Sequence, residues 1–403
     1  MASAPRVIPD AEFRAKLLER GGSTVARCFQ CATCSAVCDL APKGAPFPRR
    51  QMIRAQWGMA EQLAGDPALW LCHQCNDCTE HCPRDARPGD VMQVLRSLAI
   101  ETLAAPPIMG RLVGNARRTW PLLLGVPILF WLALLYVWHG LEIPEPPLVF
   151  HDFVPHPLIY VVYTSITLWV LVAFWAGGKR FWQLSGEGVQ RHGTFWAHLW
   201  PVLRDIATHK RFASCGPAKP RRWGHFALLW GFVAAAVASG LIIVAMYGLG
   251  NELPLAQTHP AKIIGNVGAV LLVVGGIMLL RGRLESEEQF GRTNAFDSFF
   301  LFVVLLVAFT GVLTELGRLY MEPILACTIY VVHLGAVVTL FLSAPYSKFA
   351  HILYRTLAMV HERMTAPPEE LDADDDEDDE DDEDDEDEEE ANRDDDDQAP
   401  SSG

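Results

Sequence analysis

Six long apolar stretches place the strongest constraint on how this chain can fold. They all begin after residue 119 and lie near residues 121–139, 157–178, 224–247, 260–280, 296–316 and 323–345. A helix needs about 20 apolar residues to cross the hydrocarbon core of a bilayer, whereas a helix in a soluble core is shorter and keeps a polar face. Lipid is spanned only by structures that satisfy their own backbone hydrogen bonds. The sequence therefore predicts an all-α fold with a six-helix transmembrane domain over residues 121–362.

The basic residues of the connecting loops predict how this bundle is oriented. The connection over residues 179–222 carries nine Lys or Arg residues, whereas the connections at 140–156 and 248–258 carry none. Cytoplasmic loops of membrane proteins are enriched in Lys and Arg. We therefore expect a multi-pass protein of the cytoplasmic membrane with both termini in the cytoplasm. A basic linker over residues 106–120, with Arg111, Arg117 and Arg118, is expected to meet the membrane surface.

Eight cysteines form two runs with the spacing C-x2-C-x2-C-x3-C. The first run is Cys28, Cys31, Cys34 and Cys38, and the second, 44 residues later, is Cys72, Cys75, Cys78 and Cys82. This spacing is typical of bacterial chains with two [4Fe-4S] clusters, in which the fourth cysteine of each run binds the other cluster. We therefore predict one cluster on Cys28, Cys31, Cys34 and Cys82, and another on Cys72, Cys75, Cys78 and Cys38.

A disulfide scaffold or a pair of zinc sites would also use eight cysteines. Disulfide frameworks belong to short secreted chains, and the first residues, MASAPRVIPD, do not form a cleavable apolar signal. Structural zinc usually takes its ligands as two pairs, which differs from three closely spaced cysteines and a remote fourth. The remaining cysteines, Cys215 and Cys327, lie outside both runs and are expected to be inert thiols.

Three helices are expected around the cysteine runs, in a domain over residues 1–105. An amphipathic lead helix over residues 10–20 should stop at Gly21 and Gly22. A helix over residues 48–63 has apolar residues toward one side and should pack the two cysteine lobes together. A third helix, over residues 89–103, is expected to close the domain before Pro106 and Pro107.

The charged residues are distributed very unevenly. The formal net charge is −15, but residues 369–397 contain 24 Asp or Glu, so residues 1–368 carry a net charge of +8. A block of like charges cannot bury apolar surface and repels itself. We therefore expect residues 363–403 to form a disordered acidic tail. It either only solvates the chain, or it docks a basic partner or folds back on basic loops.

Histidines in the apolar stretches are candidate metal ligands, because a polar side chain in lipid is costly unless it finds a partner. His333 and His351 are 18 residues apart, which is five turns of a continuous helix and a rise of about 27 Å. Two haems could therefore bind along one helix. His225 is the expected partner of His351, and His259 is nominated for His333. The alternatives are loop residues, namely His139, His156 and His209.

The cysteine runs, together with Trp70-Leu71-Cys72, resemble the C subunit of heterodisulfide reductase over residues 22–103. This resemblance implies an alpha-helical ferredoxin domain, a layout shared with iron–sulfur subunits of succinate dehydrogenase and glycolate oxidase. It also implies electron transfer rather than catalysis by the chain itself. The sequence has no nucleotide-binding loop, no nucleophile with its base and no flavin fingerprint, so no catalytic residue and no nucleic acid partner is expected.

The apolar half resembles the gamma subunit of respiratory nitrate reductase, a dihaem cytochrome b. The resemblance is carried by residues 333–351, by Trp223-Gly224-His225 and by residues 275–283. It implies two b haems and a quinol site near the outer one. Three haem-ligand positions fall on His225, His333 and His351, and the fourth falls near Ala235. The quinol-binding lysine falls near His259 and Lys262, so His259 is assigned either to iron or to quinone. Lys262 either donates to a quinone oxygen or is an ordinary interfacial lysine.

The fusion of these two halves resembles the membrane subunit of quinone-interacting membrane-bound oxidoreductase complexes. This resemblance implies flavin-containing partners similar to the A subunit of heterodisulfide reductase, and electron exchange with adenylylsulfate reductase. The predicted function is an electron relay between quinone, b haems, two [4Fe-4S] clusters and soluble flavoproteins. One alternative is the membrane anchor of a heterodisulfide-linked or sulfite-reduction-linked complex. Another is a haem-free transporter or signalling protein with a redox-sensing domain.

Overall fold

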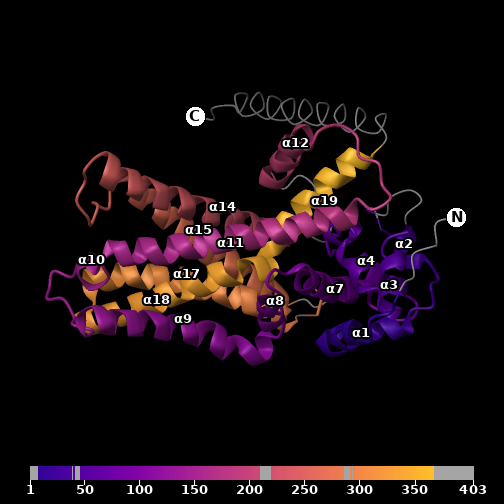
Figure 1. Ribbon diagram of the computed structural model, residues 1–403, viewed down its shortest axis with the longest axis horizontal. Coiled ribbons are helices and arrows are strands. Elements are labelled where there is room, and N and C mark those ends of the chain that lie inside the picture. The colour runs from indigo at the N-terminus through magenta and orange to yellow at the C-terminus, as the bar shows by residue number, and fades with distance from the viewer. Residues whose placement is uncertain are drawn as a thin grey trace, which may run out of the picture.

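The computed structural model describes residues 8–38, 40, 46–208, 219–285, 291–292 and 294–366. These residues form helices and connecting loops without a β-strand, so the expected all-α fold is confirmed. The expectations for residues 367–403 of the acidic tail, for His209 and for Cys215 concern residues outside the described ranges, whereas residues 363–365, which were expected to begin this tail, end a helix. Figure 1 shows a bundle of long helices with a domain of short helices at one end. We call this end of the bundle the cluster end, and the opposite end the distal end.

The N-terminal domain is built around one central helix, α7 (Pro88–Leu103), which is buried along most of its length. The shorter helices are α1 (Ala11–Leu17), α2 (Thr33–Ala36), α3 (Arg49–Gln56), α4 (Ala60–Ala64), α5 (Ala68–Leu71) and α6 (Asp77–Glu80). After α1 a π-helical turn, Leu18–Gly22, contains Gly21 at φ 107°, so the lead helix ends at the predicted glycines. The Asp10 side chain caps α1 by accepting a hydrogen bond from the Phe13 amide, at 2.9 Å.

The helix predicted over residues 48–63 is wrong, because it is two helices. Gly58 separates α3 from α4 with φ +70°, a conformation that favours glycine. A Cβ at this position would lie 2.7 Å from the Asp10 carbonyl oxygen, and the Asp10 amide donates to the Gly58 carbonyl at 2.9 Å. The break therefore lets the start of the chain approach closely. A helical periodicity in the apolar residues did not reveal this contact.

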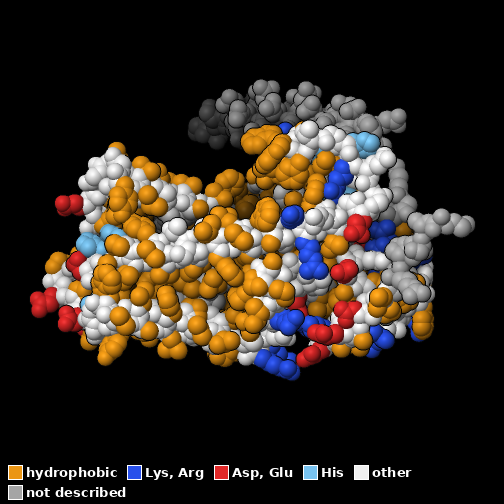
Figure 2. Space-filling view, in the orientation of Figure 1, with side chains coloured by type: hydrophobic (Ala, Val, Ile, Leu, Met, Phe, Trp, Pro, Cys, Tyr) orange, Lys and Arg blue, Asp and Glu red, His pale blue; other side chains and the backbone are white. Residues whose placement is uncertain are grey.

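Within the described ranges, six helices are long and apolar enough to cross a membrane. The spans are Ala116–His139, His156–Ser185, Arg222–Gly248, Pro260–Glu285, Ala295–Tyr320 and Pro323–Tyr346. They correspond to α9 (Ala116–His139), α11 (His156–Ser185), α14 (Lys219–Ile243) with the π-helical turn Val244–Gly248, α15 (Pro260–Glu285), α17 (Ala295–Tyr320) and α18 (Pro323–Ser343). Each predicted apolar stretch therefore lies within or close to one of these helices. Figure 2 shows hydrophobic side chains covering the bundle, with Lys and Arg gathered where it meets the N-terminal domain.

The segment predicted as a linker over residues 106–120 is mostly helical. Helix α8 (Pro107–Gly114) follows α7 directly, and α9 already begins at Ala116. Small residues then let neighbouring membrane helices approach closely. In the α14–α15 pair, a Cβ on Gly231 would lie 2.8 Å from the Leu272 side chain, and one on Gly275 would lie 2.7 Å from the Gly224 carbonyl oxygen. Such small-residue seams are a common way to pack helices in lipid.

The continuous helix predicted from His333 to His351 is wrong. Helix α18 ends at Ser343, two short 3₁₀ turns follow at Ala344–Tyr346 and Lys348–Ala350, and α19 (His351–Thr365) begins at His351. Pro345 has no backbone N–H and its ring clashes with the preceding helical turn. Between the two 3₁₀ turns, Ser347 is extended. The two histidines therefore belong to separate helices. Their spacing of 18 residues does not correspond to five turns of one helix.

The N-terminal domain packs directly on the cluster end of the bundle. Trp70, which is buried, stacks on Tyr354 of α19 with ring centres 4.8 Å apart, and meets Phe181 of α11 edge-on at 6.3 Å. The Tyr346 hydroxyl donates to the Ala105 carbonyl at 2.8 Å. The cysteine loops are thereby held at a fixed distance from the ends of the membrane helices.

Candidate functional site: two groups of cysteines and a cavity with facing histidines

The two cysteine runs have the same backbone conformation. Gln30 and Ala32 in the first run, and Gln74 and Asn76 in the second, all have φ between 57° and 72°. Gln30 corresponds to Gln74 and Ala32 to Asn76 in the 44-residue repeat. Positive φ is uncommon for residues other than glycine and is a form of local strain that functional sites use. In the first run, Cys28, Cys31 and Cys34 all line one pocket.

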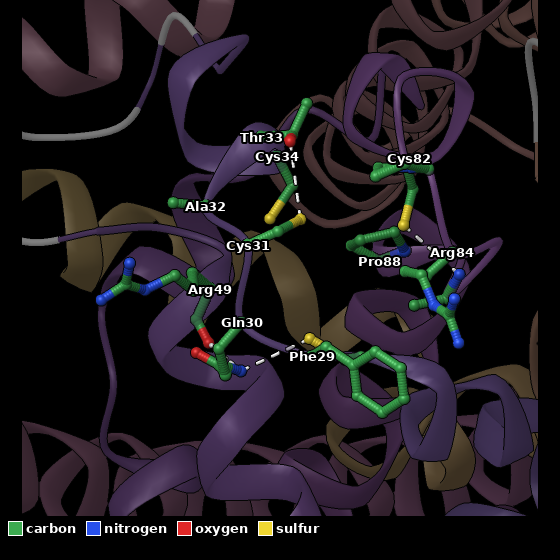
Figure 3. A pocket seen from close by; sticks show the side chains of 13 residues that line it. Phe29, Gln30, Cys31, Ala32, Thr33, Cys34, Arg49, Cys82, Arg84 and Pro88 are labelled. Atoms are coloured by element: carbon green, nitrogen blue, oxygen red, sulfur yellow. Dashed lines mark hydrogen bonds between the residues drawn. The ribbon is translucent and has the colours of Figure 1, made fainter.

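The first group of thiols surrounds a small pocket near the surface. Its lining includes Cys28, Cys31, Cys34 and Cys82, so a cysteine of the second run joins three of the first. Figure 3 shows the labelled Cys31 and Cys34 side chains close together, with Cys82 reaching the same space from another loop. Gln30 Nε2 donates to Cys28 Sγ at 3.4 Å, and the Ala86 amide donates to Cys82 Sγ at 3.4 Å. Hydrogen bonds to cluster sulfurs tune reduction potential.

The electrostatics of the buried thiols group the cysteines in the same crosswise way. Burial, with the neighbouring Cys28, Cys31 and Cys82, raises the pKa of the Cys34 thiol to about 11. Burial also raises the pKa of the Cys78 thiol, and its thiol neighbours are Cys72, Cys38 and Cys34. The structure thus brings Cys38 to the second group and Cys82 to the first. Ligation by these eight cysteines, including Cys75, stays a prediction.

Within the described ranges, no group of three or more His, Cys, Asp or Glu side chains is arranged around a single metal ion. The cysteine groups nevertheless have the composition that a [4Fe-4S] cluster requires. A cubane keeps its four thiolates apart, because each one binds a different iron atom.

A cavity of about 510 Å³ lies between the N-terminal domain and the cluster end of the bundle. His225 of α14 and His351 of α19 both line it, with ring centres 5.9 Å apart and ring planes at 75°. Two imidazoles on opposite sides of one metal atom, with metal–nitrogen bonds of about 2 Å, have ring centres about 6 Å apart. Cys72 of the second cysteine group lines the same cavity. The predicted partnership of His225 and His351 therefore has suitable geometry, and ligation itself stays a prediction.

The hydrogen bond of His351 determines which ring nitrogen is presented to the cavity. His351 Nδ1 lies 2.5 Å from the Lys348 carbonyl oxygen, which can only accept. Nδ1 therefore carries the proton and Nε2 has the free lone pair, the usual arrangement for a metal-binding histidine. Burial, with the nearby positive charges of Lys348, Arg355 and Arg96, lowers the pKa of His351 to about 4. The ring is thus neutral at ordinary pH.

Four basic side chains also line this cavity, and none of them was predicted from the sequence. They are Arg96, Arg283, Lys348 and Arg355. Arg283 Nη1 is buried and has no hydrogen-bond acceptor among the described residues. A buried donor atom without an acceptor is costly, so Arg283 Nη1 indicates a further acceptor group in the cavity, in addition to the nearby Asp297 carboxylate with which the guanidinium interacts. Spacing could have revealed Lys348 and Arg355, which lie three residues before and four after His351.

Two of these cations also contact the second cysteine loop. Arg96 donates to the Cys72 carbonyl at 2.9 Å, and Arg355 donates to the Trp70 and Leu71 carbonyls at 3.2 and 3.3 Å. Lys348 forms an ion pair with Asp297 of α17 at 3.0 Å. Gln93 of α7 also donates to Asp297. Hydrogen bonds therefore connect the cavity, the second cysteine loop and the membrane helices.

His333 lies in α18 and packs against α17. Thr310 Oγ1 donates to the Leu306 carbonyl at 2.6 Å and lies 3.0 Å from His333 Nδ1, so His333 Nδ1 carries the proton and Nε2 is left as an acceptor. Gly311 leaves room for the ring, since a Cβ there would lie 3.1 Å from His333 Cε1. The tautomer is the one that a metal ligand needs.

The other distal candidates have their own contacts. His259 precedes α15, and its Nδ1 accepts from the Ala261 amide at 3.2 Å, so it acts as a helix cap. His333 lies about ten residues into α18, or about 15 Å along the helix, so His259 is the shallower of the two. Lys262 forms an ion pair with Glu315 at 2.8 Å. His139 Nε2 contacts the Phe153 carbonyl at 2.8 Å, and the His156 ring packs on His151.

The N-terminal part of the chain is similar to known iron–sulfur proteins. Residues 24–86 match the family model "4Fe-4S dicluster domain". The C subunit of the H(2):CoB-CoM heterodisulfide,ferredoxin reductase of Methanothermobacter thermautotrophicus is 41% identical over 93 residues, 22% of this chain and 49% of the relative. A protein of Archaeoglobus profundus that resembles the C subunit of heterodisulfide reductase is 38% identical over 87 residues, 21% of this chain and 46% of the relative. The chain thus spans about half the length of these relatives. It is an iron–sulfur electron-transfer subunit related to the C subunit of heterodisulfide reductase.

The membrane half defines the family more closely. Residues 122–369 match the family model "Citrate utilization protein B". The citrate utilization protein B of Escherichia coli is 28% identical over 378 residues, which are 86% of this chain and 93% of the relative. The chain belongs to the citrate utilization protein B family. No solved structure matches it. The resemblance to the C subunit of heterodisulfide reductase is confirmed, whereas those to nitrate reductase gamma and to quinone-interacting complexes stay predictions.

Proposed function

We propose that this chain relays electrons between a quinone in the membrane and a soluble redox partner, using b haem in the bundle and two [4Fe-4S] clusters in the N-terminal domain. The observation that carries the proposal is the shared cavity. It places the facing imidazoles of His225 and His351 next to Cys72. In this proposal, a site for a membrane-bound redox group and a site for a cluster would therefore adjoin each other within one polypeptide.

Haem b fits the residues of this cavity. The two imidazoles have the spacing of axial ligands, and the volume of about 510 Å³ lies in the range for ligand pockets. Bound haem would supply one-electron transfer, with a potential set by its axial ligands and surroundings. Arg283 would donate to a haem propionate, because its buried Nη1 lacks an acceptor among the described residues. Phe232 and Phe300 line the apolar part of the cavity.

The residues around the histidines would keep this site in one geometry. The Lys348 carbonyl fixes the His351 ring through Nδ1, and the Lys348 ammonium is itself held by Asp297. Arg96 and Arg355 would lie between the bound group and the backbone of the second cysteine loop. A fixed separation matters, because electron transfer slows steeply as the distance between redox centres grows.

A second haem and the quinone belong to the distal part of the bundle in this proposal. His333 has the correct tautomer for a ligand, and Thr310 holds its ring. His259 is the proposed second ligand, or it contacts quinone. Lys262 with its partner Glu315, which also accepts from Arg318 at 3.0 Å, would form the polar end of the quinone site. Carboxylate and ammonium groups there could exchange the protons that quinol chemistry releases.

The proposed orientation places the N-terminal domain in the cytoplasm. Its support is the charge distribution, with nine Lys or Arg in the connection at 179–222 and none in those at 140–156 and 248–258. The proposed soluble partners are flavin-containing proteins resembling the A subunit of heterodisulfide reductase. Electron exchange with adenylylsulfate reductase stays a prediction that rests only on the resemblance to quinone-interacting complexes. A role in citrate utilization likewise rests only on the name of the Escherichia coli relative.

The proposal is tested by counting cofactors in the purified full chain. We expect a b-type band in the reduced-minus-oxidised spectrum and about eight iron atoms in clusters per chain. Adding a quinol should reduce the haem within the same preparation. A folded chain full of iron and sulfide but without protohaem would end the proposal, and would favour a haem-free redox-sensing membrane protein.

Arg283 provides a test of the cavity that does not depend on activity. Arg283→Gln should speed haem loss from the cluster end by roughly tenfold, the usual scale for removing a supporting contact. The measurement is the rate of haem transfer to apomyoglobin, together with the midpoint potential of the retained haem. Arg281→Gln is the matched control, because Arg281 lies on the same helix but is 72% exposed and pairs with Glu285. Equal rates of haem transfer from the two variants would exclude Arg283 as a contact of the haem.

A further inference from the structure

The two cysteine groups lie at different positions along a path from the cavity to the surface. Cys72 of the second group lines the cavity of His225 and His351, whereas the pocket of the first group shares no lining residue with that cavity. Cys34 of the first group is an electrostatic neighbour of Cys78 of the second. The order from the bundle outward is therefore the cavity, the second group and then the first group.

The first group opens on an exposed face, which we call the Phe29 face. It consists of Phe29, Cys31, Arg49, Pro83 and Arg84, all of which line the pocket of this group. The Phe29 ring is 68% exposed, and the guanidinium carbon of Arg84 lies 4.3 Å from its centre. Cys31 is also exposed. A large aromatic ring held in solvent beside a predicted cluster ligand is typical of a contact surface.

The charges around this face are basic. Among the described residues, the pocket lining contains two arginines, Arg49 and Arg84, and no carboxylate. At its edge, Arg27 and Asp85 form an exposed ion pair at 2.5 Å and so largely neutralise one another. No ion pair joins Arg49 or Arg84 to an acid among the described residues. The surplus positive charge is complementary to an acidic protein.

We propose that the Phe29 face is the docking site for an acidic soluble redox protein, which exchanges electrons with the chain through the cluster predicted on Cys28, Cys31, Cys34 and Cys82. Each event moves one electron between that cluster and the partner's cofactor. One centre is oxidised as the other is reduced, and no bond or proton is exchanged. The inference rests on the proposed function only for the presence of the clusters and not for haem or quinone.

The physical requirements of such a contact agree with this face. Redox partners form small and transient interfaces, in which complementary charge raises the association rate more than the affinity. Arg84 would supply this attraction, and Phe29 would supply a rigid apolar centre that excludes water. Because cation–π contact positions Arg84 over Phe29, the two side chains would be ordered before the partner arrives. The cost of docking is correspondingly small.

The test uses the full chain with its clusters oxidised and a reduced plant-type [2Fe-2S] ferredoxin as the probe. This protein is an acidic one-electron donor with a potential of about −400 mV. Stopped-flow bleaching of cluster absorbance measures the second-order rate. Arg84→Glu should lower this rate about tenfold at low ionic strength. In about 1 M salt, where the Debye length is about 3 Å, the difference should disappear.

Matched variants separate docking from damage. Arg118→Glu makes the same charge change on an 82% exposed side chain of α9, and it should change the rate less than about twofold. Arg84→Lys keeps the charge, so its ferredoxin rate should stay close to that of the unchanged chain. Phe29→Ala should lower the rate even in high salt. Reduced methyl viologen, a small cation, should reduce the Arg84→Glu variant at least as fast as the unchanged chain.

Two results would overturn the proposal. One is an equal ferredoxin rate for Arg84→Glu and Arg118→Glu with full cluster content. The other is a ferredoxin rate in Phe29→Ala and Arg84→Glu that falls only as far as their iron content falls. Both side chains are exposed and should not be needed to retain the cluster, so such a result would mean that the rate follows cluster loss and not docking. Neither result depends on haem, so failure of the docking site can be told apart from failure of the haem proposal.

Discussion

Replacing His351 with alanine should remove the haem at the cluster end and leave the iron and sulfide content unchanged. The imidazole of His351 lies with its ring centre 5.9 Å from that of His225, and among the described residues one further histidine, His73 of the second cysteine loop, lines their cavity. Loss of one axial ligand removes the bond that holds the iron on that side, while the cysteine groups lie in another domain. The measurement is the haem content by pyridine haemochrome, with iron and acid-labile sulfide measured on the same sample.

His361→Ala is the matched control for this variant. His361 is also buried on α19, but its Nε2 contacts the Ser185 carbonyl at 2.7 Å and it does not line the cavity. Its replacement should lower stability by about 1–3 kcal/mol through the lost hydrogen bond and packing, while haem is retained. Full haem content in the His351→Ala chain would contradict the proposed ligand pair. Loss of all cofactors together would contradict the separation into two domains.

Cys82→Ser should destroy the cluster of the first cysteine run, although Cys82 belongs to the second. The structure places Cys82 around one pocket with Cys28, Cys31 and Cys34, and Cys38 is an electrostatic neighbour of Cys78. Iron content should fall from about eight to about four atoms per chain. A single variant does not reveal which cluster is lost, so the informative comparison is between two double variants.

The double variants distinguish crossed from uncrossed ligation. Cys28→Ser with Cys82→Ser should lose no more iron than Cys82→Ser alone, because both cysteines are predicted on one cluster. Cys72→Ser with Cys82→Ser should lose nearly all the iron, because one ligand of each cluster is removed. This non-additivity identifies partners as a double-mutant cycle does. The reverse pattern, with severe loss only in the first pair, would establish uncrossed ligation.

Regular spacing in the sequence was sufficient to predict the main elements. The apolar stretches marked six helices, because a bilayer crossing needs a length that few soluble helices reach. The repeat of 44 residues predicted that Cys82 and Cys38 exchange places. In the structure Cys82 lines the pocket of the first run and Cys38 is an electrostatic neighbour of Cys78, while the crossed ligation itself stays a prediction. His225 and His351 could be paired because each lies at the end of an apolar stretch on the side of the basic loop.

What the sequence did not reveal depends on contacts between distant segments. One continuous helix was expected through Pro345, whereas an extended Ser347 and two 3₁₀ turns interrupt it. Gly58 breaks a periodic segment because the backbone of Asp10 lies against it. Arg96 and Arg283 come from α7 and α15 and meet only in the folded cavity. No local pattern distinguishes them from ordinary surface arginines.

The exchange of cysteines between the two loops has a consequence for biosynthesis. If Cys82 completes the first cluster, the three thiols of the first run cannot form that cluster until the ribosome has synthesised the second cysteine run. The 48 residues from Cys34 to Cys82 take roughly 2–10 s at about 5–20 residues per second. Neither cluster can then be inserted into a nascent fragment that ends before Cys78, and the first cluster must also wait for Cys82. The crossed arrangement therefore acts as a checkpoint on translation, since a chain truncated before residue 78 retains no complete iron site and a chain truncated before residue 82 lacks the first site.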